Sequence, residues 1–182
     1  MNSDVVASDF GLKSFPGTKN WFAVFTVPRN EKRVAEHFRI REIESFLPLF
    51  ESQRRWRDGS KPVLQLPLFP CYIFVRIDRR MRVSVLEVPG VIMIVGSMRQ
   101  ALQVPDSYIQ VLREGLRQGK IEAHECLHVE AGAKVRIRSG LMAGMEGVLI
   151  RKKNSFRVLL TLEMIMKSMT VEIGMDDIEH IN

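Results

Sequence analysis

The sequence predicts an α+β fold, with an N-terminal antiparallel sheet and packed helices followed by a small all-β barrel. Three observations lead to this prediction. Residues 71–78 alternate between two faces, as a β-strand does. Residues 31–45 and 105–118 have the apolar spacing of amphipathic helices. Residues 131–182 contain short apolar runs separated by glycines, a pattern typical of small all-β units.

The composition is compatible with a polyanionic partner. The 182 residues carry a formal net charge of +6, and the excess lies in residues 20–118, where 16 Lys and Arg stand against 10 Asp and Glu. Two cysteines are too few for a disulfide framework, so we expect a cytoplasmic protein. Because no apolar run approaches about 18 residues, we expect no membrane span.

The chain divides into four predicted parts. Residues 1–19 lack periodicity and are expected to form a mobile tail. Residues 20–118 would form the first domain. Residues 119–130 are acidic and unpatterned, so we expect a linker there. Residues 131–182 would form the second domain.

The first domain opens with a predicted strand over residues 21–27. Asn30 suits the N-cap of a helix over residues 31–45, in which Val34 and Phe38 would face a sheet.

A hairpin is expected next. Its strands would cover residues 46–50 and 63–66, and Asp58-Gly59 is a strong signal for its turn. Pro70 cannot donate a hydrogen bond to a sheet, so the following strand should begin only after it.

A short helix, a strand and a long helix complete the first domain. The short helix is predicted over residues 79–87, and a buried strand over residues 91–95. The long helix should run from Pro105 to Gly119, which can end it. The inward residues would be Met81, Val85 and Leu86 in the short helix, and Ile109, Leu112 and Leu116 in the long one.

The second domain is predicted to be all-β. Its five strands would cover residues 132–140, 147–151, 156–162, 169–173 and 178–181. Within the third of these strands, one of the adjoining Leu159 and Leu160 should point away from the core if the strand alternates regularly.

Two basic sets are candidates for DNA contact. Arg33, His37 and Arg41 follow one another at helical spacing and make a cationic stripe, although such a stripe can also be a solvated helix face. Around the hairpin turn, basic residues are interleaved with Trp56, a combination that binds phosphates and stacks bases but that can equally keep a hairpin tip soluble. This second set consists of Arg54, Arg55 and Arg57.

The strand after Pro70 has two different faces. Its aliphatic face reads as core and consists of Cys71, Ile73, Val75 and Ile77. The other face carries Tyr72 and Phe74 beside charges, which indicates either a docking surface or a face that lies under a helix.

One motif points to metal chemistry. His124, Glu125 and His128 match the H-E-x-x-H pattern of zinc proteases, and a small zinc-dependent hydrolase is therefore an alternative function. The motif lies in the expected linker and no third ligand is fixed, so we expect no metal, no cofactor and no catalytic residue.

Residues 67–75, Pro-Leu-Phe-Pro-x-Tyr-x-Phe-Val, resemble the central motif of the NusG family of transcription elongation factors. Trp21-Phe22, residues 88–91 and residues 104–106 continue the resemblance to its N-terminal (NGN) domain. Residues 135–147 resemble the KOW motif, which implies that the second domain is a KOW barrel.

The resemblance implies a binding protein without enzymatic activity that suppresses pausing or termination. It implies that the aromatic residues dock on the clamp helices of the largest RNA polymerase subunit and that the basic sets contact non-template DNA. A small-subunit ribosomal protein is the implied KOW partner, and we expect a monomer. The implied polymerase-binding residues are Phe25, Phe69, Tyr72 and Phe74, and the partner-binding residues of the KOW domain are Phe156, Leu159 and Leu160. A KOW-type RNA- or ribosome-binding protein is a further alternative.

The sequence departs from the housekeeping pattern in three places. Gly140-Leu-Met stands where Gly-Pro-Phe is usual, and residues 162–173 replace the later Phe-Gly-Arg…Thr-Pro-Val-Glu segment, which makes binding of the termination factor Rho doubtful. Pro70-Cys71 replaces the family's Pro-Gly. The segment at residues 162–173 and Pro70-Cys71 favour a specialised paralogue similar to RfaH and the capsule-operon antiterminators.

Overall fold

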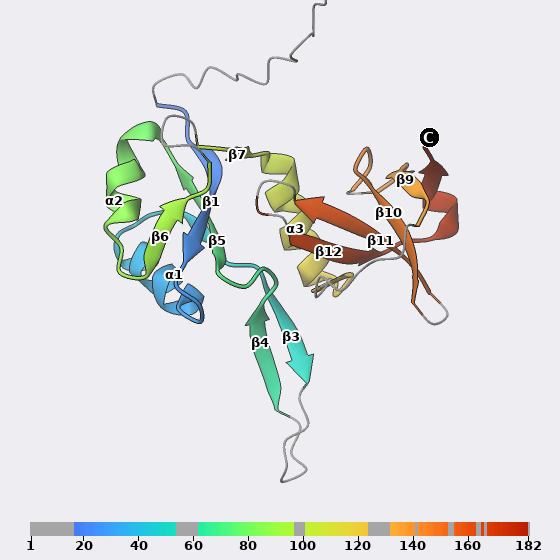
Figure 1. Ribbon diagram of the computed structural model, residues 1–182, viewed down its shortest axis with the longest axis horizontal. Helices are drawn as coiled ribbons and strands as arrows, with labels where there is room; N and C mark the ends of the chain where they lie inside the picture. The colour runs from blue at the N-terminus through green and yellow to red at the C-terminus, as the bar shows by residue number, and fades with distance from the viewer. Residues whose placement is uncertain are drawn as a thin grey trace, which may run out of the picture.

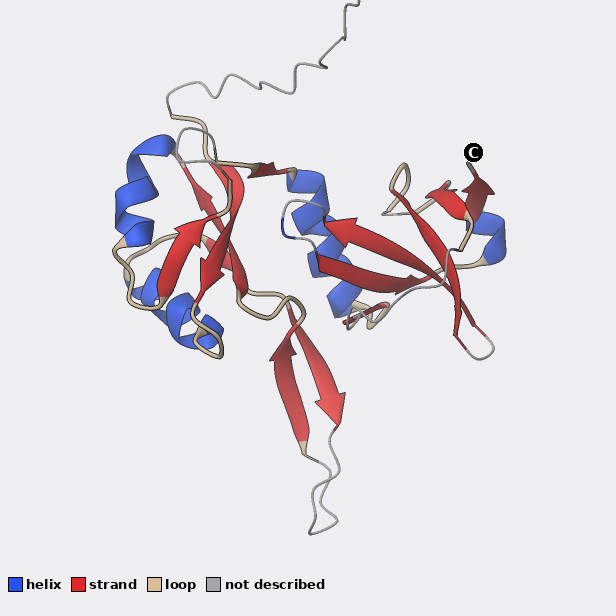
Figure 2. Cartoon of the chain, in the orientation of Figure 1, coloured by secondary structure: helices blue, strands red, loops and turns tan. Residues whose placement is uncertain are grey.

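A computed structural model of the chain describes residues 17–53, 62–96, 101–123, 132–140, 142–152, 155–162, 165 and 167–181 (Figure 1). The first part contains β1 (Asn20–Thr26), α1 (Glu31–Ile40), β2 (Ser45–Phe46), β3 (Leu49–Gln53), β4 (Val63–Pro67), β5 (Tyr72–Ile77), η1 (Arg79–Met81), α2 (Arg82–Leu86), β6 (Val91–Ile94), β7 (Gln103–Val104) and α3 (Asp106–Arg117). The remainder contains β8 (Ile121–Ala123), β9 (Lys134–Ile137), β10 (Glu146–Lys152), β11 (Ser155–Leu162), β12 (Lys167–Glu172), η3 (Met175–Asp177) and β13 (Ile178–His180). Figure 2 shows how the helices and strands are distributed.

The N-terminal sheet has the strand order β2-β5-β1-β6, with β7 paired to β1. All its pairs are antiparallel, and Phe25 of β1 lies opposite Tyr72 of β5. Helices α1 and α2 cover one face of the sheet, whereas α3 lies on the other side, between the two sheets (Figure 1). The predicted antiparallel sheet with packed helices is therefore confirmed.

Helix α1 ends at Ile40, earlier than the predicted residue 45, because the chain turns into a left-handed conformation at Glu42, where φ is 55°. The backbone N–H of Glu42 donates to the Arg39 carbonyl at 3.2 Å, and that of Ile43 donates to the Phe38 carbonyl at 2.9 Å. These two bonds close the helix, and the burial of Ile43 beside Phe38 supports the closure. Asn30 precedes the helix as expected, but its side chain makes no capping hydrogen bond.

The predicted strand over residues 46–50 is divided between two sheets. Ser45–Phe46 pairs with β5, whereas Leu49–Gln53 pairs with β4 in a separate hairpin that projects away from the N-terminal sheet (Figure 1). Pro48 lies between them, and its carbonyl accepts a hydrogen bond from Leu68 N–H at 2.8 Å. This bond fixes the root of the hairpin against the chain that enters β5.

The burial predicted for β6 is correct only in part. Ile94 is buried, but Ile92 and Met93 are 50% and 43% exposed. Among the described residues, β6 is an edge of the N-terminal sheet and β1 is its strand partner. In the preceding helix, Val85 is buried and Met81 half-buried as predicted, but Leu86 is exposed.

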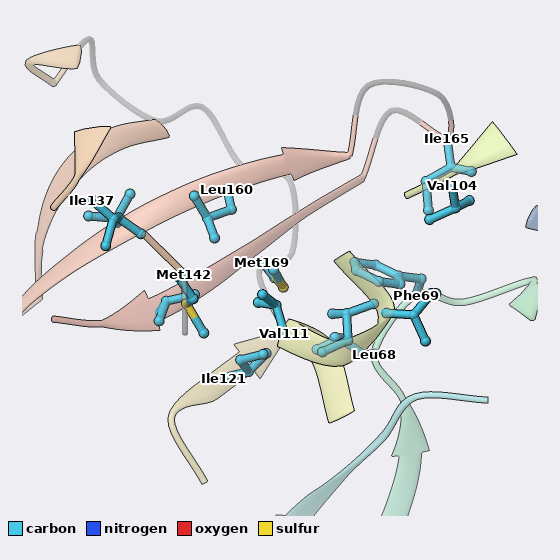
Figure 3. Close-up of a cluster of buried hydrophobic side chains, with 14 of the residues drawn as sticks. Leu68, Phe69, Val104, Val111, Ile121, Ile137, Met142, Leu160, Ile165 and Met169 are labelled. Carbon is cyan, nitrogen blue, oxygen red and sulfur yellow. The ribbon is translucent and has the colours of Figure 1, made fainter. Parts of the chain in front are cut away.

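Helix α3 is buried on two sides. Ile109 and Leu112 are buried and Leu116 is half-buried, as predicted, and Gly119, with φ of 65°, follows the helix end. Val111 is also buried, and it belongs to a hydrophobic cluster that continues into the C-terminal sheet. We call this cluster the shared core. Figure 3 shows that side chains from both parts of the chain line it, including Val111 from α3 and Met169 from β12.

The C-terminal sheet has the strand order β13-β9-β10-β11-β12-β8. All five predicted strands are present, and β8 adds a sixth that was not predicted, because Ile121–Ala123 lies in the expected linker and pairs with β12. The order runs as an open path from β13 to β8, and the described residues do not form the closed barrel that the sequence suggested.

Candidate binding surfaces

The aromatic residues of the central segment lie together on the N-terminal sheet. The Phe25 and Tyr72 rings have centroids 5.2 Å apart, and both side chains are half-buried. Phe74 contacts the Phe69 ring edge-on at 6.2 Å and stacks on Phe46 at 6.4 Å. The structure therefore brings together all four residues expected to bind polymerase, in two neighbouring pairs.

Phe69 and Phe74 are not exposed, being 1% and 0% accessible. Both belong to the shared core, so the strand face that could have been a docking surface is covered at Phe74. The other interpretation, a face packed inside the protein, therefore holds for Phe74. Ile165, from the β11–β12 connection, is 4% exposed and also belongs to the shared core (Figure 3). Only Phe25 and Tyr72 of the expected set remain accessible.

A buried carboxylate holds the turn before β5. The Glu31 side chain is buried at the start of α1, and its Oε1 accepts a hydrogen bond from Cys71 N–H at 2.8 Å. Cys71 has φ of 70°, a left-handed conformation that favours glycine. Thr26 N–H donates to the Cys71 carbonyl at 2.8 Å. These bonds fix the positions of Phe69 and Tyr72 on either side of the turn.

An arginine on α3 covers the other end of the aromatic face. The Arg113 guanidinium lies 5.3 Å from the Trp21 ring centroid and 5.1 Å from that of Phe46. Sequence analysis missed this contact, because helical spacing alone does not pair a residue of α3 with residues of β1 and β2. The contact shows that this face of the sheet lies under α3.

The cationic stripe on α1 is present in part. Arg33 and Arg41 are exposed, and Arg41 lies just beyond the helix end, where its Nη1 donates to the Ser84 carbonyl at 3.3 Å. His37 is half-buried, and its Nε2 atom is buried without a hydrogen-bond partner in the described part of the chain. Two of the three predicted residues therefore offer their charge to solvent.

Several predicted residues lie outside what the structure describes. Arg54, Arg55 and Arg57 fall in the undescribed hairpin tip, and the H-E-x-x-H motif, His124, Glu125 and His128, also lies outside the described residues. Within the described residues, no group of three or more His, Cys, Asp or Glu side chains is placed to hold a metal ion. Those residues also contain no helix that is both long and apolar enough to cross a membrane.

Leu159 and Leu160 alternate along β11 as predicted, because Leu160 belongs to the shared core and Leu159 does not. The outward Leu159 is nevertheless buried, so neither leucine is exposed to a partner. Leu159 lies opposite Thr170, which is itself buried, so the second face of this strand is covered as well. Phe156 lies in β11, but its side chain is outside the described part of the structure.

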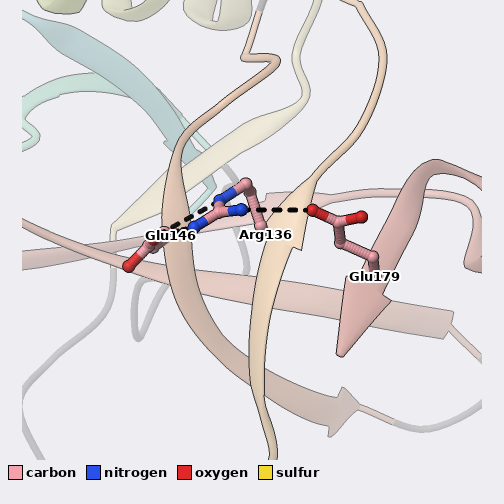
Figure 4. Close-up of polar contacts among 3 residues, drawn as sticks. All are labelled: Arg136, Glu146 and Glu179. Carbon is pink, nitrogen blue, oxygen red and sulfur yellow. Dashed lines mark hydrogen bonds and ion pairs between the residues drawn. The ribbon is translucent and has the colours of Figure 1, made fainter. Parts of the chain in front are cut away.

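The exposed surface of the C-terminal sheet carries a paired arginine. Arg136 Nη2 lies 2.6 Å from Glu146 Oε1, and its Nη1 lies 3.4 Å from Glu179 Oε1 (Figure 4). The two carboxylates raise the pKa of Arg136, mainly through the hydrogen bond to Glu146. These three residues tie β9, β10 and β13 together at the surface.

Two groups beside the shared core have shifted pKa values. Burial raises the pKa of Tyr108, whose hydroxyl has no partner among the described residues. Hydrogen bonds from Arg117 and Gln118 lower the pKa of Glu114 to about 2. Glu114 borders a cavity of about 760 Å³ between α3 and the C-terminal sheet, where Ser139 and Asp177 are hydrogen-bonded to each other.

Comparisons with known proteins identify relatives of this architecture. A family model described as transcription termination factor nusG matches residues 19–113. A structure titled "Domain interaction in Thermotoga maritima NusG" matches with a TM-score of 0.56 and 22% identity, over 90% of this chain and 98% of that chain. At this identity, the match establishes the fold alone.

Two further structures match less well. Both are titled as an MjSpt4:Spt5 complex, in conformations A and B, with TM-scores of 0.30 and 0.29 and identities of 18% and 16%. Each covers 89% of this chain, and 98% and 97% of the matched chains. Scores this low carry no argument. Comparison with curated protein sequences gives no match.

Proposed function

Because the chain belongs to the NusG family of transcription factors, we propose that it is an elongation and antitermination factor that binds RNA polymerase and suppresses pausing or termination. Members of this family act with RNA polymerase and are not enzymes, so a zinc hydrolase is not supported. The observation that carries the proposal is the aromatic set on the N-terminal sheet, within the part of the chain that the family model matches.

The proposed polymerase contact is the clamp-helix region of the largest subunit. Phe25 and Tyr72 would make the first contacts, because they are the half-buried pair of the set. Phe69 can contribute only when the shared core opens, since its side chain is buried there. Phe74 would pack in the core below this surface and stabilise it. The proposed binding state therefore differs from the closed arrangement of this structure.

The remaining assignments are also proposals. Arg33, His37 and Arg41 would contact non-template DNA, with Arg54, Arg55 and Arg57 as a second set. The C-terminal part would act as a KOW domain that recruits a small-subunit ribosomal protein. Because Leu159 and Leu160 are buried, Phe156 is the remaining candidate of that predicted set. The protein would be a cytoplasmic monomer that is specialised for particular operons. Its binding to the termination factor Rho is doubtful.

Alanine substitution at the aromatic pair tests the proposal. A ring that fills an interface pocket typically contributes about 2 kcal/mol, so Tyr72→Ala should weaken polymerase binding by roughly 30-fold. Phe74→Ala is the matched core variant and should instead lower the free energy of unfolding by about 3–5 kcal/mol. The measurements are polymerase affinity and the melting temperature of both variants. Full polymerase binding and antipausing activity by a folded Tyr72→Ala/Phe25→Ala variant would contradict the proposal.

A further inference from the structure

The arginines of this chain differ in what they contact. Arg39, Arg117 and Arg136 lie 2.6, 2.5 and 2.6 Å from a carboxylate oxygen. A second group has no ion pair with any described residue. It includes Arg33, Arg41, Arg79, Arg80 and Arg82. An arginine without a carboxylate partner keeps its guanidinium donors available for an external anion.

The unpaired arginines lie on neighbouring elements. Helices α1 and α2 cover the same face of the N-terminal sheet, and Arg41 joins them through its hydrogen bond to the Ser84 carbonyl. At the other end of α1, a Cβ added to Gly90 would lie 3.0 Å from Val34 Cγ2. The chain from α2 to Gly90 therefore packs against α1 at two points, with Arg41 against α2.

A side-chain cap holds the turn that leads into α2, where Arg79 and Arg80 lie. The Asp78 carboxylate accepts hydrogen bonds from Arg80 N–H at 2.7 Å and Met81 N–H at 3.1 Å, which caps η1. Met81 and Val85 pack against the core on the inner side. Arg79 and Arg80 are consequently left exposed, while Asp78 uses its charge within the turn.

The described carboxylates near this surface make no ion pair with the unpaired arginines. Glu44 lies 3.9 Å from Arg76, and Glu42 and Glu87 are exposed without an ion pair in the described part of the chain. These charges reduce the local positive potential, so the surface should bind phosphates moderately and without reading the base sequence.

We propose that Arg79, Arg80 and Arg82, continuous with Arg41, form a second phosphate-binding segment that contacts the DNA backbone beside the α1 stripe. The planar guanidinium matches the geometry of a phosphate, and three arginines within four residues can follow successive phosphates. This inference rests on the proposed function, because the elongation complex supplies the DNA.

The test measures binding of the full chain to a labelled forked DNA duplex as salt increases. Each phosphate contact contributes about 0.9 to the slope of log affinity against log salt. The variant R79A/R80A/R82A should therefore lose about 2 to 3 from that slope. The control R39A/R117A/R136A removes the same charge from arginines that have carboxylate partners, and it should keep the slope. R79K/R80K/R82K should retain most of the slope.

Three results would overturn the inference: an unchanged slope in the folded alanine variant, equal losses in the alanine and control variants, or loss of the slope in the lysine variant. Should the triple alanine variant fail to fold, R79A and R80A measured singly should each lower the slope by about 0.9. Polymerase binding is measured separately on the wild-type chain. Failure there rejects the proposed function, whereas an unchanged slope in the presence of normal polymerase binding rejects only this segment.

Discussion

Replacing Ile165 with aspartate should raise the affinity of the chain for RNA polymerase. Ile165 is 4% exposed and belongs to the same hydrophobic cluster as Phe69, which the closed arrangement removes from solvent. In the wild-type chain, the shared core would have to open before Phe69 could contribute to polymerase binding. Weakening the shared core makes the binding-competent form more populated and thereby strengthens apparent binding.

The size of the effect follows from the burial of one aliphatic side chain. Removing a buried isoleucine from an apolar contact costs about 1.5–3 kcal/mol, and a buried carboxylate adds to that cost. A change of about 2 kcal/mol corresponds to a shift of roughly 30-fold between closed and open forms. Polymerase affinity should rise by up to this factor if the closed form dominates in solution.

Binding of immobilised polymerase to the full-length variants measures the effect. Ile165→Val keeps an apolar side chain, should weaken the contact by only about 0.5–1.5 kcal/mol, and serves as the control. Ile165→Asp with unchanged or weaker polymerase affinity, in a protein whose melting still reports a folded N-terminal sheet, would refute the reasoning. The burial of Phe69 in the shared core would then have no influence on polymerase binding.

Three further substitutions test other parts of the structure. Cys71→Gly should stabilise the chain by about 0.5–1 kcal/mol in denaturant unfolding, because glycine adopts the left-handed conformation of φ 70° without strain; an unchanged midpoint would contradict this. Gly115→Ala should lower the melting temperature, since the added Cβ would clash with the Ile121 side chain, whereas Gln110→Ala at an exposed position of the same helix should not. The pKa of Glu114 is lowered to about 2, so its contribution to stability is present above its ordinary pKa of 4.5 and is lost as pH falls towards 2. Glu114→Gln should therefore flatten the acid limb of a pH–stability curve, and an unchanged acid limb would show that solvent screens this surface pair.

Local signals in the sequence predicted much of the N-terminal part. Alternation over residues 71–78 assigns Ile73 and Val75 to one face and Tyr72 and Phe74 to the other, and the two clusters of buried residues follow this division. Helix α3 was likewise predicted from its apolar spacing. The early end of α1 was not, because Glu42 adopts the left-handed conformation in which glycine or asparagine is usual.

What covers each face could not be predicted from alternation. A strand pattern shows which side chains share a face, but it does not reveal whether α3 or solvent lies over Phe74. Leu159 and Leu160 illustrate the same limit, since both faces of β11 are buried. The prediction for Ile92 is wrong in the opposite way, because this side chain was expected to be buried and is exposed. An apolar run indicates a central strand, whereas β6 lies at an edge among the described strands.

The double burial of α3 has a consequence for solubility. If the C-terminal sheet moved away, Val111 and the side of α3 at Gly115 would lose their cover together with Leu68 and Phe69. The separated form would therefore expose apolar surface on both of its parts, and such patches promote self-association. We expect a chain held open without a partner to aggregate at concentrations at which the closed chain stays monodisperse.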